Sequence, residues 1–300
     1  MKHTDNVVKK TAGKTPASWL FLMPALTLNV VVMLIPSIFT IFLSFTEWNG
    51  LGTPKIIGLG NFAGFFRERN FFLAIKNTIK WMAFFLTIPF IMSLLMAVIL
   101  LFRKKGRTFF QSVFFLPNII SPVIICSLFT SMIFHPRSGI LGFINSSHFL
   151  PFTLANPLAD VRTSIWACMF VDNWHWWGFM TVIFLAAMRQ VDENMLEAAE
   201  IDGAGFMKRF TAVIIPSIKS NIFFMVLMTI IWTFLTFDYI WILTGGGPAN
   251  SSEMLSTLAY RMSFYTHEIG RGAAASLTMS FLAGVVIFVY VLMQIREETV

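Results

Sequence analysis

Six apolar runs alternate with polar connections along the 300-residue chain. Each run reaches the ~20 residues that a helix needs to cross the hydrocarbon core of a bilayer. We therefore predict an all-α polytopic membrane protein, with a polar tail at 1–17 and a transmembrane domain at 18–296. The six predicted spans are residues 18–45, 81–102, 108–134, 163–188, 220–243 and 272–295.

Several of the predicted spans contain polar or ionisable residues, which are costly in a membrane and so suggest a functional site. In the third span, Pro117 and Pro122 also interrupt the helix, and irregular backbone at membrane depth must face protein or a water-filled cavity. A structural role, as buried pairs or as an interfacial aromatic belt, remains open for these residues. The candidates for a substrate path are Asn118, Asp172, Asn173, Trp174, Trp232, Asp238 and Tyr239, with His175 close by.

Composition supports the membrane assignment. Apolar residues make up 56% of the chain and charged residues only 12%, which is too few for an ordinary soluble domain. A net charge of +7 would suggest nucleic acid as the partner of a soluble protein, but here we expect none. Lys and Arg are retained on the cytoplasmic side of membrane proteins, and the basic turn at 103–107 marks that side. This orientation places both termini in the cytoplasm.

The chain lacks the motifs of an enzyme. No phosphate-binding loop is present, because Val8 stands where its first glycine is required. His267 and Glu268 begin a zinc-protease pattern, but Arg271 replaces the second histidine. Cys126 and Cys168 lie in apolar runs without metal-ligand spacing. We therefore expect no catalytic residue, no metal and no cofactor.

The longest polar segment on the predicted cytoplasmic side, residues 190–218, reads as two short helices joined by glycine. Asp192 is a helix start signal, and Gly203 and Gly205 end or kink the first helix. The second helix is amphipathic and is expected to end at Pro216. Its predicted apolar side carries Phe206, Phe210 and Val213, and its polar side carries Lys208, Arg209 and Thr211.

This segment resembles the Glu-Ala-Ala-x-x-x-Gly-(x)9-Ile-x-Leu-Pro loop of the permease subunits of binding-protein-dependent ABC importers. The matching residues are Glu197, Ala198, Ala199, Gly203 and Pro216, with Val213 and Ile215 as aliphatic replacements at the remaining positions. Two further stretches are similar to the carbohydrate branch, which includes the maltose and glycerol-phosphate permeases. They are 202–204 and 243–248, the second containing Gly245, Gly246, Gly247 and Pro248.

The resemblance implies a multi-pass permease in a bacterial inner membrane that works by alternating access. Its partners would be membrane lipid, two copies of an ATP-binding subunit, a second homologous permease and an extracytoplasmic sugar-binding protein. The residues implied in coupling are Glu197, Ala198, Ala199, Asp202, Gly203 and Pro216, and the glycine-rich stretch would be an outer loop that contacts the binding protein.

Two other classes remain as alternatives. An ion- or proton-coupled secondary transporter needs carboxylates at mid-membrane depth, and Asp172 and Asp238 are the candidates for them. An intramembrane enzyme is disfavoured by the missing motifs. The sequence leaves the transported carbohydrate open, from a monosaccharide to an oligosaccharide or a polyol phosphate.

Overall fold

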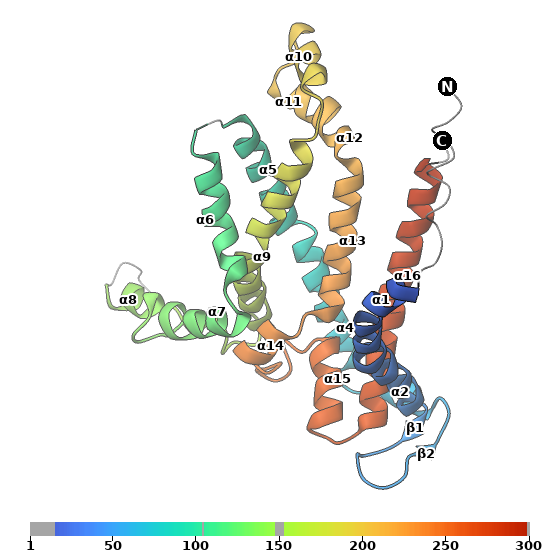
Figure 1. Ribbon diagram of the computed structural model, residues 1–300. Coiled ribbons are helices and arrows are strands. Elements are labelled where there is room, and N and C mark those ends of the chain that lie inside the picture. The colour runs from blue at the N-terminus through green and yellow to red at the C-terminus, as the bar shows by residue number, and fades with distance from the viewer. Residues whose placement is uncertain (1–15, 104, 148–152, 299–300) are drawn as a thin grey trace, which may run out of the picture.

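The computed structural model describes residues 16–103, 105–147 and 153–298, and these form an almost entirely helical molecule (Figure 1). The first half of the chain contains α1 (Pro16–Asn29), α2 (Ile35–Ser44), α3 (Gly60–Phe66), α4 (Phe71–Phe85), α5 (Ile88–Phe102), α6 (Arg107–Ile119), α7 (Pro122–Leu128) and α8 (Ile140–Ser146). The second half contains α9 (Ser164–Met188), α10 (Glu193–Ile201), α11 (Phe206–Arg209), α12 (Ile215–Ser217), α13 (Lys219–Leu235), α14 (Asp238–Leu243), α15 (Leu255–Phe264) and α16 (Ile269–Glu298).

Short π-helical turns and one small hairpin complete the described elements. The π turns are Val30–Leu34 between α1 and α2, Phe129–Ile133 after α7, and Phe210–Ile214 between α11 and α12. Strands β1 (Thr46–Glu47) and β2 (Lys55–Ile56) pair antiparallel, with Thr46 opposite Ile56. Most of the predicted tail, residues 1–15, lies outside the described part of the chain, and α1 begins at Pro16.

Helix α9 forms the centre of the molecule. It packs against α5 and α6, and also touches α4, α13 and α14. Of its 25 residues, 17 are buried, so polar side chains such as Asp172 face protein rather than lipid. This burial explains how one helix can carry Asp172, Asn173 and His175 within a membrane protein.

Three described helical stretches are long and apolar enough to cross a membrane, or five if each of two bent pairs is one span. The unbent stretches are Phe21–Ser44, Phe71–Phe102 and Ile269–Gln294, so the second begins ten residues before the predicted start at residue 81. α9, the predicted fourth span, is not among these stretches, because buried polar residues lower its hydropathy. The most apolar part of Ile269–Gln294 contains no buried residue, so its surface can contact lipid or another chain.

Two of the predicted spans are broken. In the third, the predicted interruption at Pro122 is confirmed, whereas Pro117 lies inside α6. The fifth, predicted as one run at 220–243, is also broken. α6 and the helix that begins with α7 meet at an angle of 95°, across Ile120 and an extended Ser121 just before Pro122. The fifth span breaks without a proline, because Thr236 is extended between α13 and α14. α14 then covers only six residues.

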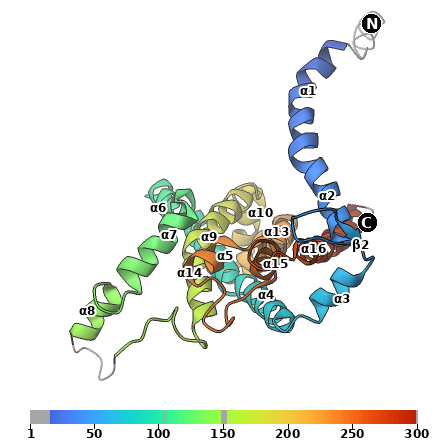
Figure 2. The same ribbon diagram turned by 90° about the horizontal axis from the view of Figure 1, so that it is seen from below.

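The predicted loop and the hairpin lie at opposite ends of the molecule. Helices α10 and α11 project beyond the bundle at one end, near the turn between α5 and α6, whereas β1, β2 and α15 lie at the other (Figure 1). Seen along the perpendicular view, α1 stands away from the bundle (Figure 2). Its side chains from Phe21 onward are exposed, and all but Thr27 and Asn29 are apolar.

Candidate functional site

The two helix breaks meet at one cavity of about 340 Å³. One wall is the junction of α6 and α7, another is the junction of α13 and α14, and α9 contributes His175. α7 packs against α14, which brings the two junctions together. The lining residues are Asn118, Ile119, Ile120, Ser121, Pro122, His175, Trp232, Leu235, Thr236, Phe237, Asp238 and Tyr239.

The cavity combines a few polar groups with a large apolar surface. Asp238 begins α14, and the Tyr239 ring centroid lies 5.9 Å from that of His175. Trp232 stacks on Trp176 at a centroid distance of 5.1 Å and an interplanar angle of 15°. A pocket of hydrogen-bonding groups beside aromatic and aliphatic walls suits a small polar ligand that also has apolar C–H faces. Helix breaks inside a membrane protein are tolerable where they line such a cavity.

The structure divides the predicted substrate-path residues into two groups. Asn118, Trp232, Asp238 and Tyr239 line the cavity, whereas Asp172, Asn173 and Trp174 do not. Ser121 and Thr236 also line it and were not predicted. Pro122 signals the break beside Ser121, but no residue type signals the break at Thr236.

Asp172 is buried on α9 with 1% of its surface exposed. Neither of its carboxylate oxygens has a hydrogen-bond partner within the described residues, and the same holds for the Tyr239 hydroxyl. Asp172 lies three residues before His175 on α9, and so on the same side of the helix as this cavity-lining residue. Trp174, in contrast, packs against Phe129 at a centroid distance of 5.6 Å, as a core residue would. Asp172 therefore lies beside the cavity as an unpaired buried polar group.

The second candidate site is the segment α10 to α12, which contains the Glu-Ala-Ala residues. Asp192 caps α10 as predicted, because its carboxylate accepts a hydrogen bond of 2.9 Å from the Asn194 N–H. At the other end, the Ala204 N–H donates to the Ala199 carbonyl and the Gly203 N–H donates to the Glu200 carbonyl, at 2.9 and 3.0 Å. This pair of bonds is a Schellman motif, which requires a left-handed residue after the helix. Gly203 supplies it with φ of +76°.

The second half of the segment folds back on the first. Arg209 is turned inward and forms an ion pair of 2.7 Å with Glu200, so its predicted place on the polar side was wrong. Its guanidinium also lies 5.9 Å from the ring of Phe102 at the end of α5, and Phe102 contacts Phe206 edge to face. Phe210 and Val213 pack against the core as predicted. The segment is thus braced internally and against α5.

Pro216 lies at the end of the second helical run. The run ends one residue later, at Ser217, and the chain bends by 70° before α13 begins at Lys219. The predicted stop at Pro216 is therefore confirmed to within one residue.

The outer face of this segment is polar at its centre and apolar around it. Glu197, Ala198, Asp202 and Gly203 are exposed, and Ala199 is half-buried. Ile201 and Met207 leave 86% and 65% of their surface exposed beside them. Exposed large apolar side chains on a projecting, braced element are typical of a surface that binds another protein.

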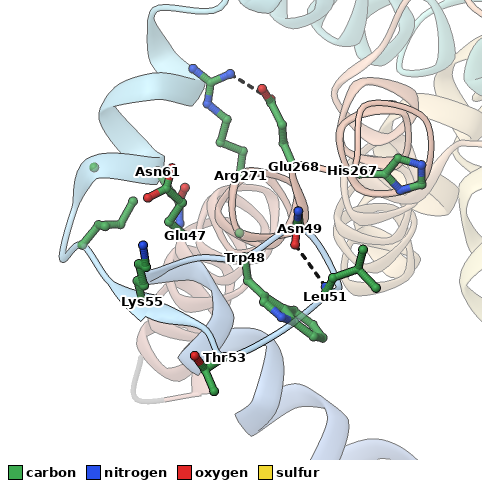
Figure 3. Close-up of a pocket in the computed structure, with 13 residues that line it drawn as sticks. Glu47, Trp48, Asn49, Leu51, Thr53, Lys55, Asn61, His267, Glu268 and Arg271 are labelled. Carbon is green, nitrogen blue, oxygen red and sulfur yellow. Dashed lines mark hydrogen bonds and ion pairs between the residues drawn. The ribbon is translucent and has the colours of Figure 1, made fainter.

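Two further features lie at the opposite end. A hollow of about 650 Å³ separates the β1–β2 hairpin from the start of α16 (Figure 3). It is lined by charged and polar groups, including Glu47 and Lys55, and by the ion pair of Arg271 and Glu268 at 2.8 Å. The glycine-rich stretch Gly245, Gly246, Gly247 and Pro248 is also at this end, but it is half-buried or buried.

Comparisons with known proteins give consistent matches. Residues 56–297 match the family model described as binding-protein-dependent transport system inner membrane component. The chain is 32% identical over 259 residues to the probable ABC transporter permease protein YurN of Bacillus subtilis, covering 85% of this chain and 88% of that protein. It is 28% identical over 280 residues to the probable starch degradation products transport system permease protein AmyD of Thermoanaerobacterium thermosulfurigenes, covering 93% and 94%.

The fold is also similar to that of a solved structure. A chain from the crystal structure of a bacterial alginate ABC transporter, in complex with an alginate pentasaccharide-bound periplasmic protein, superposes with a TM-score of 0.80. The sequence identity is 22%, and the match covers 91% of this chain and 92% of that chain.

Proposed function

The chain belongs to the family of binding-protein-dependent transport system inner membrane components, and on this premise we propose that it carries a carbohydrate through the cavity at its helix breaks. It is a multi-pass inner-membrane permease of an ABC importer and is not itself catalytic. The similarity to AmyD, named for the transport of starch degradation products, supports a sugar or oligosaccharide as the cargo.

One structural relationship carries the proposed mechanism: the α10–α12 segment is inserted between α9 and α13, two of the helices that line the cavity. α9 precedes the segment and carries His175, and α13 follows it and carries Trp232. Each of these residues lies thirteen positions from the end of its helix that adjoins the segment, about 20 Å at 1.5 Å per residue. A rigid movement of the segment is therefore transmitted to two walls of the cavity at once.

The ATP-binding subunits supply that movement in this mechanism. The exposed patch around Glu197 docks into a cleft on such a subunit, where Glu197 pairs with a cation or caps backbone N–H groups. Ala198 and Gly203 allow the close approach, with Ala199, Asp202 and Pro216 completing the coupling segment. Closure of the two ATP-binding subunits then draws the coupling segments together and opens the cavity outward.

The orientation follows from the same assignment. α10–α12 and the basic turn between α5 and α6 lie at one end, which is cytoplasmic, as are both termini of a six-span chain. The exposed apolar surfaces of α1 and α16 contact lipid and a second homologous permease. At the outer end, the Gly245–Pro248 stretch presents Ala249 to the sugar-binding protein.

Co-purification tests the docking surface. Tagged permease is isolated from membranes of cells that also express the ATP-binding subunit, and the recovered subunit is quantified by mass spectrometry. The subunit is expected with the unmodified chain and to be lost with Glu197→Lys. Glu47→Lys is the matched control, since it reverses an exposed carboxylate at the opposite end and should retain the subunit. Equal recovery with both variants would contradict the assignment of the docking surface.

A further inference from the structure

The segment that follows α14, residues 244–253, is held in place by an ion pair between a buried carboxylate and a partly exposed arginine. Glu253 has none of its surface exposed, and Arg261 on α15 reaches it with Nη2 at 2.9 Å from Oε2. The same nitrogen donates a hydrogen bond of 2.6 Å to the carbonyl of Gly245. The guanidinium also lies 5.8 Å from the ring of Trp241 on α14. One cation therefore ties α15, the segment and α14 together.

Gly246 fits only because it has no side chain. A Cβ at this position would lie 2.5 Å from Glu253 Oε2 and 3.0 Å from Arg261 Nη2, and φ is +86°. The glycine-rich stretch therefore wraps closely around the ion pair, which is a different role from that of a flexible turn.

Polar side chains fasten the rest of the segment. Within it, the Ser252 hydroxyl donates to the Gly247 carbonyl at 2.7 Å and lies 2.8 Å from the Thr244 hydroxyl. From α4, the Asn77 amide donates to the carbonyls of Ser251 and Glu253, both at 2.9 Å. These bonds join the segment to the bundle, so that only Ala249 of residues 244–253 is exposed.

α14 depends on these contacts for its position. It has six residues, which is too short for a helix to be stable without tertiary contacts. At its start, the Ser256 hydroxyl donates to the Thr236 carbonyl at the break with α13. At its end, Arg261 contacts both Trp241 and Gly245. Both ends of the helix that carries Asp238 and Tyr239 are therefore fixed from the α15 side.

We propose that Glu253 and Arg261 act as positioning residues, which hold α14 against the carbohydrate cavity by locking residues 244–253. That the cavity carries a carbohydrate rests on the proposed function. That Glu253 and Arg261 hold residues 244–253 in place does not depend on it. An ion pair with a buried carboxylate is suited to this role, because removal of one partner leaves the other without its opposite charge and favours an open local structure.

Amide hydrogen exchange tests the lock directly in the assembled importer in lipid nanodiscs. Glu253→Gln is expected to accelerate exchange at Gly245, Gly247 and Ser252, whose N–H groups are hydrogen-bonded in the locked segment, by at least about tenfold. Exchange in α14 should also increase. Arg261→Lys keeps a positive charge opposite Glu253, so this variant should retain part of the protection that Glu253→Gln loses. Glu268→Gln is the matched control, because it removes the partly exposed pair with Arg271 and should leave this segment unchanged.

Unchanged exchange in Glu253→Gln would overturn the proposal. If that variant does not assemble, Glu253→Gln combined with Arg261→Gln provides the same test, since it removes the ion pair without leaving an uncompensated charge. Sugar uptake per ATP hydrolysed is measured in parallel and is expected to fall with the loss of protection. Faster exchange with normal uptake would support the role of Glu253 and Arg261 in holding residues 244–253. It would count against the cavity as the sugar path, so the two proposals can be distinguished.

Discussion

The guanidinium of Arg209 on α11 lies 2.7 Å from the carboxylate of Glu200 on α10, and this pair closes the α10–α12 segment on itself. Glu200 is mostly exposed, whereas Arg209 is largely covered and also contacts Phe102. An ion pair with an exposed partner contributes ~1 kcal/mol or less to stability. Its main effect is therefore to fix the angle between two short helices rather than to stabilise the whole protein.

Arg209→Met is expected to weaken coupling with little change in thermal stability. The two halves of the segment would no longer move as one body, so less sugar would be carried for each ATP hydrolysed. The ratio of uptake to ATP hydrolysis in proteoliposomes measures this. Lys208→Met, which removes the neighbouring exposed charge, is the control and should behave as the unmodified protein does. An unchanged ratio in Arg209→Met would show that coupling does not need the ion pair of Arg209 and Glu200.

Gly203→Ala is expected to strain the end of α10 through the backbone alone. An added Cβ would meet no atom within 4 Å, but φ of +76° costs an L-residue about 1–2 kcal/mol. Uptake should fall while the protein is still inserted in the membrane. Gly205→Ala also meets no atom and has φ of −64°, so it should be neutral. Equal uptake by the two variants would argue against the Schellman motif as the functional reason for Gly203.

Asp238→Asn is expected to reduce uptake by about tenfold or more. A hydrogen bond to a charged group is worth ~1.5–3 kcal/mol, and ~1.4 kcal/mol corresponds to a factor of ten. Uptake by the reconstituted importer is measured at saturating binding protein, with protein amount and ATP hydrolysis recorded alongside. Glu47→Gln neutralises a carboxylate that lines the hollow beside the β1–β2 hairpin instead of the cavity, and it should retain normal uptake. Normal uptake by Asp238→Asn would remove this carboxylate from the sugar path.

Asp172→Asn distinguishes a functional role from a structural one. The Asp172 carboxylate is buried without a hydrogen-bond partner within the described residues, so its neutralisation should keep or raise the apparent melting temperature. We expect uptake to fall nonetheless, because the carboxylate lies beside the cavity. A lower melting temperature with normal uptake per folded molecule would instead indicate a structural partner.

The sequence predicted the features that are encoded locally. Asp192 begins α10 and Gly203 ends it, because capping and left-handed geometry depend on single residues and their neighbours. The family resemblance to carbohydrate permeases is also confirmed. It could be recognised in the sequence because it rests on an extended motif rather than on one residue.

Features that depend on tertiary packing were missed. The break at Thr236 has no proline to signal it. The inward position of the Arg209 side chain depends on Glu200 and on Phe102, and neither is a neighbour of Arg209 in the sequence. Similarly, periodicity could not reveal that Asp238 lines the cavity whereas Asp172 lies beside it. The ion pair of Glu253 and Arg261 was also missed, because nothing in a single sequence links those two charges.

The most direct test is sugar uptake by proteoliposomes that contain the complete importer, with ATP inside, binding protein outside and no ion gradient. Uptake by an ATP-driven importer is expected to require both ATP and the binding protein, to be insensitive to an ionophore, and to be lost with Glu197→Lys. Uptake that proceeds without ATP and collapses when an ionophore removes an imposed ion gradient would contradict this mechanism.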